Sequence, residues 1–216
     1  MSLTALAVVA SAAAENYQYK IVASDHTIAA HVALKRAELG GLPGWTGGAV
    51  KPDRSPETEA DRCGGYLPKQ SDLVVTGDAE TQYSYRGTEI DTQVSVLRTS
   101  AMVETDWKRQ LGYPNYAACQ KKIAARELPK SSRLVSFAKL PYQQFGTKSV
   151  AYRAMIDVTT TSRAVSVALD FVGFYRGRTE VSVIISGVAP TAADRAVLSA
   201  LDNRVSAVVA TKIPAS

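Results

Sequence analysis

The amino-acid sequence predicts an α+β domain in which helices from the N-terminal, middle and C-terminal parts of the chain pack on one antiparallel β-sheet. Two observations predict this class. The second half of the chain contains runs of alternating apolar and polar residues, and turns short enough for antiparallel hairpins separate the last of them. Segments with helical spacing stand before, between and after the strand-like runs and do not alternate regularly with them.

Composition narrows the possible functions. With 216 residues, 46% of them hydrophobic and 21% charged, the chain has the size of one domain with a substantial core. No apolar run approaches the roughly 18 residues that predict a transmembrane helix. The formal net charge is +5, which would attract an anionic envelope ligand, but the basic residues are too scattered to predict nucleic-acid binding.

The N-terminal segment predicts export. Residues 1–14 contain "LTALAVVASAAA", an apolar stretch of small residues with an A-x-A cleavage pattern before Glu15. No positively charged leader precedes it, so an ordinary buried helix end is the alternative. We expect a secreted or extracytoplasmic protein with an N-terminal extension over 15–24 and a single α+β domain over 25–216.

The first helix is predicted over residues 25–39, with Asp25 as its N-cap and with a left-handed glycine at Gly40 or Gly41 ending it. It carries both histidines of the chain, His26 and His31. Their spacing of five does not suit a metal pair on one helix face, so we predict no metal and no cofactor.

A long surface loop is predicted from Gly40 to Lys69, where glycine, proline and charged residues predominate. Its "LGGLPGWTGG" stretch lacks the lysine that ends a phosphate-binding loop, and a helix precedes it where a strand is required. Trp45 therefore either anchors the loop in the core or lies at the rim of a groove.

Two cysteines, Cys63 and Cys119, are far apart and without metal-like spacing. In an exported chain they most economically form one disulfide, which would join the loop to a helix. A buried free thiol and a catalytic nucleophile are the alternatives, and the nucleophile would need a histidine partner.

The remaining elements follow from periodicity. A hairpin turning at Gly87 is predicted from "TQYSYR" and "EIDTQVSVLR", and two helices from residues 100–111 and 115–127. The final elements are strands at residues 132–140, 148–160, 163–176 and 178–188, followed by a helix that begins near Thr191 and Asp194.

Polar residues on two of these strands are the candidate site. In the alternating pattern, Arg153 and Asp157 fall on the same face of their strand, and Asp170 falls on the corresponding face of the next strand. If the C-terminal helix covers the apolar face, these side chains would line a shallow ligand groove with Trp45 nearby. A solvated face with cross-strand ion pairs is the alternative.

The order of elements, the "LPGW" turn, Cys63, Cys119 and the Arg176-Gly177 hairpin resemble exported actinobacterial proteins related to the PknH-type extracellular sensor domain. More loosely, they resemble PsbP-like and LpqN-like lipoproteins. The resemblance implies an α+β sandwich, a non-catalytic role at the cell envelope and a cleft for a ligand. The sequence departs from it in having no kinase domain, no lipobox cysteine and no second cysteine pair.

Three functions follow as hypotheses. The first is an exported, non-catalytic, sensor-like module that binds a small-molecule or anionic envelope ligand. The second is an envelope protein that interacts with another protein or has a structural role. The third is a secreted hydrolase that uses Asp157 and Asp170, which would require the two carboxyl groups to lie about 5–10 Å apart in a pocket.

Overall fold

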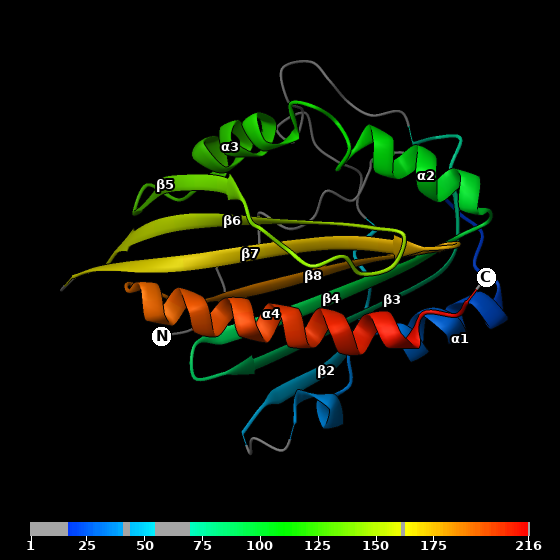
Figure 1. The fold of residues 1–216 in the computed structure, drawn as a ribbon, viewed down its shortest axis with the longest axis horizontal. Coiled ribbons are helices and arrows are strands. Elements are labelled where there is room, and N and C mark those ends of the chain that lie inside the picture. Colours follow the sequence, from blue (N-terminus) through cyan, green and yellow to red (C-terminus); the bar gives the residue numbers. More distant parts are fainter. Residues whose placement is uncertain (1–16, 41–43, 55–69, 161–162, 216) are drawn as a thin grey trace.

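The computed structural model describes residues 17–40, 44–54, 70–160 and 163–215. They form one mostly antiparallel sheet with helices on both of its faces, which confirms the predicted α+β class (Figure 1). The strands are β1 (Gln18–Tyr19), β2 (Thr46–Val50), β3 (Val74–Tyr85), β4 (Thr88–Leu97), β5 (Ser132–Lys139), β6 (Lys148–Thr159), β7 (Ala164–Arg176) and β8 (Thr179–Val188). The helices are α1 (Ala23–Val32), the 3-10 helix η2 (Arg36–Leu39), α2 (Ser100–Arg109), α3 (Tyr116–Glu127) and α4 (Ala192–Lys212).

The strands follow the order β1-β3-β4-β8-β7-β6-β5, and β2 pairs with β3 off this path. Every pairing is antiparallel except that of β1 with β3. The predicted meander of the last strands is therefore confirmed. At the β3–β4 turn, Arg86 and Gly87 have φ values of 47° and 79°, the two positive angles that a tight hairpin turn of matching twist requires.

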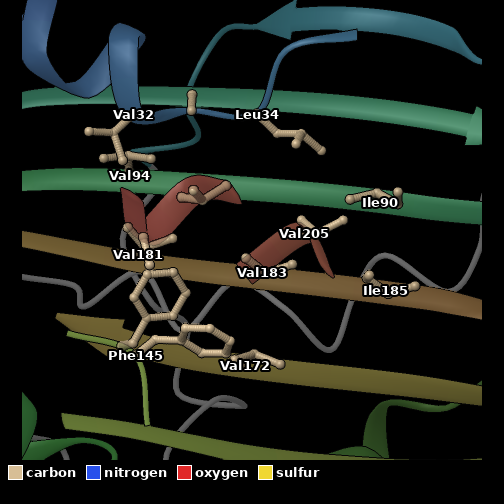
Figure 2. Close-up of a cluster of buried hydrophobic side chains, with 14 of the residues drawn as sticks. Val32, Leu34, Ile90, Val94, Phe145, Val172, Val181, Val183, Ile185 and Val205 are labelled. Atoms are coloured by element: carbon tan, nitrogen blue, oxygen red, sulfur yellow. The ribbon is translucent and has the colours of Figure 1, made fainter. Parts of the chain in front are cut away.

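The two faces of the sheet are covered by different helices. α1 and α4 lie on one face, here called the α4 face, and α2 and α3 lie on the opposite face, here called the α2/α3 face (Figure 1). The main hydrophobic core lies between the sheet and α1 and α4. Figure 2 shows Val205 of α4 in this core together with Val183 and Ile185 of β8.

The first helix is shorter than predicted. α1 begins at Ala23 and ends at Val32, so the single helix expected over residues 25–39 is wrong, and η2 follows as a separate turn. Asp25 is not the N-cap. Its buried carboxylate accepts a hydrogen bond of 2.6 Å from Thr76 Oγ1 and two of 3.0 Å from the guanidinium of Arg178. These contacts fix the start of α1 on the sheet.

The predicted loop over residues 40–69 contains a strand. Gly40 ends η2 in the left-handed conformation, with φ of 71°, as expected. Trp45 and β2 follow, and β2 pairs with β3 where the sequence predicted no strand. Trp45 is only 4% exposed and packs against Tyr85 with ring centroids 5.5 Å apart. The tryptophan is therefore a core anchor that holds β2 against the sheet.

Replacing Trp45 with alanine should lower the free energy of unfolding by about 3–5 kcal/mol, because it leaves a large cavity in the main core. Trp45→Phe should retain most of the stability, since the indole Nε1 has no hydrogen-bond partner to lose. Urea unfolding followed by circular dichroism measures both. A loss below about 1 kcal/mol in the alanine variant would contradict the anchoring role.

Candidate functional site

Arg153 and Asp170 lie opposite each other on β6 and β7, on the face that α4 covers. Arg153 is 9% exposed and Asp170 is fully buried. The guanidinium donates from Nε and Nη2 to the two carboxylate oxygens, and Nη2 also donates to Ser199 Oγ of α4 at 2.9 Å. The structure therefore brings these two predicted residues together, as a buried ion pair between the sheet and a helix.

This placement corrects the expected position of the C-terminal helix. The helix packs on the face that carries Arg153 and Asp170, while the opposite parity of β6 faces α3. The reason is that α4 itself brings polar groups to that face. A ligand-binding role for Arg153 and Asp170 stays a prediction, and in the structure both are enclosed beneath a helix.

Asp202 of α4 is a buried residue that sequence reasoning missed. It is fully buried, and burial and the neighbouring Asp170 carboxylate raise the pKa of Asp202 to about 10. Neither of its carboxyl oxygens receives a hydrogen bond. Asp202 therefore keeps its proton at neutral pH. The sequence did contain an indication of it, because Asp202 is a carboxyl residue within the apolar stripe of the predicted C-terminal helix.

Asp157 lies apart from the ion pair. It accepts hydrogen bonds from Arg133 Nη2 at 2.9 Å and from Ser166 Oγ at 2.8 Å, and both lower its pKa, the serine more strongly. Asp157 is opposite Ser166 in the β6–β7 register, whereas Asp170 is opposite Arg153. Four residues of strand separate the two carboxylates, or about 13 Å. That separation does not suit the proposed hydrolase pair.

A groove runs along the α2/α3 face of the sheet. One cavity of about 140 Å³ opens beside α2, and a second of about 330 Å³ lies among β2, β3, β4 and β8. A small hollow of about 20 Å³ joins them, because it shares Tyr116 and Phe171 with the first and Leu169 and Ile184 with the second. We call the three together the sheet groove.

The walls of the sheet groove differ in chemistry. The floor contributed by β3, β4 and β8 is rich in carboxyl and amide groups, and the side towards β7 and α3 is apolar and aromatic. The acidic and amide residues that line it are Asp78, Glu80, Gln82, Glu89, Asp91, Gln93, Asp106, Gln110 and Glu180. Its large apolar and aromatic residues include Tyr17, Tyr19, Trp107, Leu111, Tyr116, Phe137, Leu169, Phe171 and Ile184.

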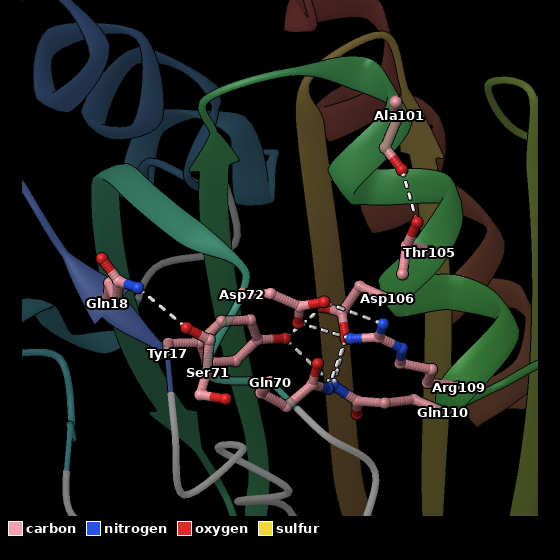
Figure 3. Close-up of polar contacts among 10 residues, drawn as sticks. All are labelled: Tyr17, Gln18, Gln70, Ser71, Asp72, Ala101, Thr105, Asp106, Arg109 and Gln110. Carbon is pink, nitrogen blue, oxygen red and sulfur yellow. Dashed lines mark hydrogen bonds and ion pairs between the residues drawn. The ribbon is translucent and has the colours of Figure 1, made fainter.

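Asp106 of α2 is the best-held carboxylate of the groove. It is 2% exposed and accepts hydrogen bonds from the hydroxyl of Tyr17 and the side-chain amides of Gln70 and Gln110 (Figure 3). Glu180 of β8 lies beside it. Burial, and then the negative charge of Asp106, hold the pKa of Glu180 well above its ordinary value. The carboxyl group of Glu180 is therefore harder to ionise than a solvent-exposed glutamate.

A second carboxyl pair, Glu80 and Asp91, lies further along the groove. The side-chain amide of Gln82 donates to Glu80 Oε1 at 2.8 Å and to Asp91 Oδ2 at 3.0 Å. Burial, and then the charge of Glu80, raise the pKa of Asp91 to about 7. Asp91 Oδ1 is buried without a hydrogen-bond partner. This end of the groove thus has an acceptor that no protein donor uses.

Arg54, among the described residues, places a positive charge beside the groove. Its Nε and Nη2 donate to the two oxygens of Asp78 at 2.7 Å each, and its guanidinium lies 4.9 Å from the ring centroid of Tyr19. Among the described residues, no lysine or arginine forms an ion pair with the buried carboxyl residues Glu80 and Asp106, or with the half-buried Asp91 and Glu180.

The sequence did contain a signal for the groove. Glu80, Asp91 and Glu180 occupy the polar parity of their strands, and such residues usually face solvent on one side of an antiparallel sheet. Only the register of β3, β4 and β8 shows that they gather on one floor.

Two predicted features fall outside the described residues. Cys63 is one of them, so its disulfide with Cys119 of α3 stays a prediction, and the signal-like segment over residues 1–14 is the other. Within residues 17–40, 44–54, 70–160 and 163–215, no three His, Cys, Asp or Glu side chains are grouped closely enough to hold a metal ion. In the same part of the chain, no helix combines the length and apolar character needed to span a membrane.

Comparison with known proteins gives only loose structural likenesses. No model of a known protein family matches the chain. No curated protein matches it either. A solved structure of an uncharacterised Mycobacterium smegmatis protein, the Rv0999 ortholog, is 14% identical with a TM-score of 0.45, over 86% of this chain and 98% of that one.

Two further solved structures are more distant. LpqN of Mycobacterium tuberculosis, a protein involved in cell envelope biogenesis, is 12% identical with a TM-score of 0.31, over 78% of this chain and 84% of its own. A Pseudomonas aeruginosa protein of unknown function is 14% identical with a TM-score of 0.30, over 56% and 74% of the two chains. LpqN agrees loosely with the resemblance inferred from the sequence. Overlaps this loose carry no information about function.

Asp202→Asn should flatten the pH dependence of stability. The folded-state pKa of Asp202 is raised, so its stabilising contribution is complete at low pH and is lost as pH rises towards about 10. Between pH 5 and pH 9 the wild-type protein should therefore lose stability relative to the variant, by at most about 1.4 kcal/mol per pH unit.

Urea unfolding at each pH measures this difference, with Asp157→Asn as the control. The pKa of Asp157 is lowered, so any stability that it contributes is already complete above pH 5 and its replacement should leave the slope unchanged. Identical slopes for wild type and Asp202→Asn would show that Asp202 is ionised in the folded protein.

Proposed function

We propose that the chain is an exported, non-catalytic binding module of the cell envelope, and that its ligand site is the sheet groove. The observation that carries this proposal is the contrast between the two faces of the sheet. The α4 face is filled by the main core and by the Arg153–Asp170 pair, whereas the α2/α3 face retains a cavity of about 330 Å³ beside one of about 140 Å³. Volumes in this range suit a small ligand.

The composition of the groove supports binding. Ligand sites usually combine apolar and aromatic walls with a few polar groups that orient the ligand. Here Tyr116 and Phe171 line the same cavity as Glu80, Asp106 and Glu180. The signal-like segment over residues 1–14 supports the export part of the proposal.

We propose that the module is non-catalytic because of where its candidate catalytic carboxylates lie. Asp157 and Asp170, the carboxylates that the sequence offered for hydrolysis, are each held by an arginine and are separated by about 13 Å along β7. His26 of α1 has its Nδ1 2.8 Å from the backbone oxygen of Asp78, a residue that lines the first cavity and whose carboxylate is already held by Arg54.

Filling the groove should abolish ligand binding. Ser186 lines the larger cavity, and Ser186→Trp would occupy it, whereas Ser131→Trp adds the same side chain at an exposed turn. Isothermal titration against aliphatic amines, neutral oligosaccharides and fatty acids should find a ligand that binds wild type and Ser131→Trp but not Ser186→Trp. At about 100 times its Kd such a ligand should stabilise the folded protein by about 2.7 kcal/mol.

A ligand that binds Ser186→Trp as tightly as wild type would place the site elsewhere. If none of the three ligand classes binds the wild-type protein, the proposed binding function is wrong.

A further inference from the structure

We infer that the sheet groove binds an elongated aliphatic cation with an ammonium group at each end, that is, a diamine or polyamine. This inference rests on the proposed function and adds the chemical class of the ligand. It differs from the anionic ligand that the net charge of +5 favours, because the charge inside the groove has the opposite sign to that of the whole chain.

The two carboxyl pairs, Asp106 with Glu180 and Glu80 with Asp91, set the length of the ligand. Glu180 lies opposite Ser95 in the β4–β8 register, whereas Asp91 lies opposite Ile184. The two carboxyl groups are thus on adjacent strands and four residues apart, which corresponds to about 13 Å. One ammonium group beside Asp106 and Glu180 and another beside Glu80 and Asp91 would span this distance.

The wall at the Asp91 end of this span is apolar. Phe171 and Ile184 are directly opposite each other on β7 and β8, and both line the hollow that joins the larger cavities. A chain of methylene groups can lie against them without leaving a polar group unpaired. On the floor midway between Glu180 and Asp91, Ser182 and Gln93 form a register pair that can accept a hydrogen bond from an internal amine.

The chain's own Arg54 shows that this groove holds a cation. The guanidinium lies over Tyr19 and donates two hydrogen bonds to Asp78, and both of these partners line the first cavity. An aromatic face together with a carboxylate is the arrangement that binds ammonium and guanidinium groups in proteins. Tyr17 and Trp107 line the same cavity, beside the Asp106–Glu180 pair.

The charges of the groove favour an ammonium ligand over a neutral one. Burial, and then the neighbouring carboxylate, raise the pKa of Glu180 and of Asp91, so full ionisation of either pair is unfavourable when no cation is present. An ammonium group between the two carboxylates of a pair can offset their repulsion. A diol or a sugar can hydrogen-bond to the same oxygens but leaves the repulsion in place.

Isothermal titration of the wild-type protein at pH 7.5 and low ionic strength tests the inference with four probes. The probes are spermidine, 1,8-diaminooctane, octylamine and 1,8-octanediol. Spermidine and the diamine should bind, octylamine should bind at least about tenfold more weakly because it fills one carboxyl pair, and the diol should not bind measurably. Raising the salt concentration should weaken the binding of both polyvalent probes.

Two isosteric variants locate the ends of the ligand. Glu180→Gln and Asp91→Asn should each weaken diamine binding at least about tenfold, while leaving the weaker binding of octylamine at the other pair. Asp157→Asn, which removes a carboxylate from the opposite face of the sheet, is the matched control and should bind as wild type does. Thermal unfolding of each variant confirms that it is folded.

The results separate this inference from the proposed function. Diamine binding that is equal in Glu180→Gln, Asp91→Asn and wild type would overturn the cationic assignment. A neutral ligand that binds and is excluded by Ser186→Trp would also overturn it, but would leave the groove as the binding site. If none of the four probes, no oligosaccharide and no fatty acid binds, both proposals are wrong.

Discussion

The buried ion pair between Arg153 and Asp170 determines which face of the sheet is closed. Two charges on the floor of an otherwise apolar face need polar partners, because a buried charge without them costs several kcal/mol. α4 supplies a partner through the hydroxyl of Ser199, and it places the protonated carboxyl group of Asp202 beside Asp170. The buried ion pair of the sheet needs polar neighbours, and α4 carries them. This match therefore fixes both the face on which α4 packs and its position along that face.

Closing one face leaves the other with a different role. Once α4 and α1 have buried the main core, the α2/α3 face needs apolar cover only over β5 to β7, which α3 gives, and at the end of the sheet near α2. The remaining floor, formed by β3, β4 and β8, carries several carboxyl groups close together. In a groove with little solvent, their negative charges would repel one another. That unfavourable arrangement is the reason to regard the groove as a binding site, because a cationic ligand relieves it.

The sequence predicted the regular elements better than the site. Alternating residues identified the long strands and their hairpins, and Thr191 with Asp194 correctly marked the start of α4 through a capping box. The short strand β2 was missed, because "TGGAV" has the composition of a loop and pairs only because Trp45 is held in the core. Local propensity contains no information on such a long-range contact.

The candidate site was the hardest part to predict for the same reason. A strand with polar residues on one face has the same sequence pattern whether that face is exposed to solvent, covered by a helix or part of a groove. Arg153 and Asp170 were correctly placed on a common face, yet which helix covers it depends on Asp202, about 30 residues further along the chain. The gathering of Glu80, Asp91 and Glu180 depends on the strand order.

Methyl-labelled NMR spectroscopy during a spermidine titration tests the central claim, that one face of the sheet is closed and the other binds. Ile184 and Ile185 are neighbours on β8 and point to opposite faces of the sheet. The account predicts that the methyl resonances of Ile184 and Leu169 shift as spermidine is added, while those of Ile185 and Val183 do not. Shifts at Ile185 and Val183 with none at Ile184 would contradict it.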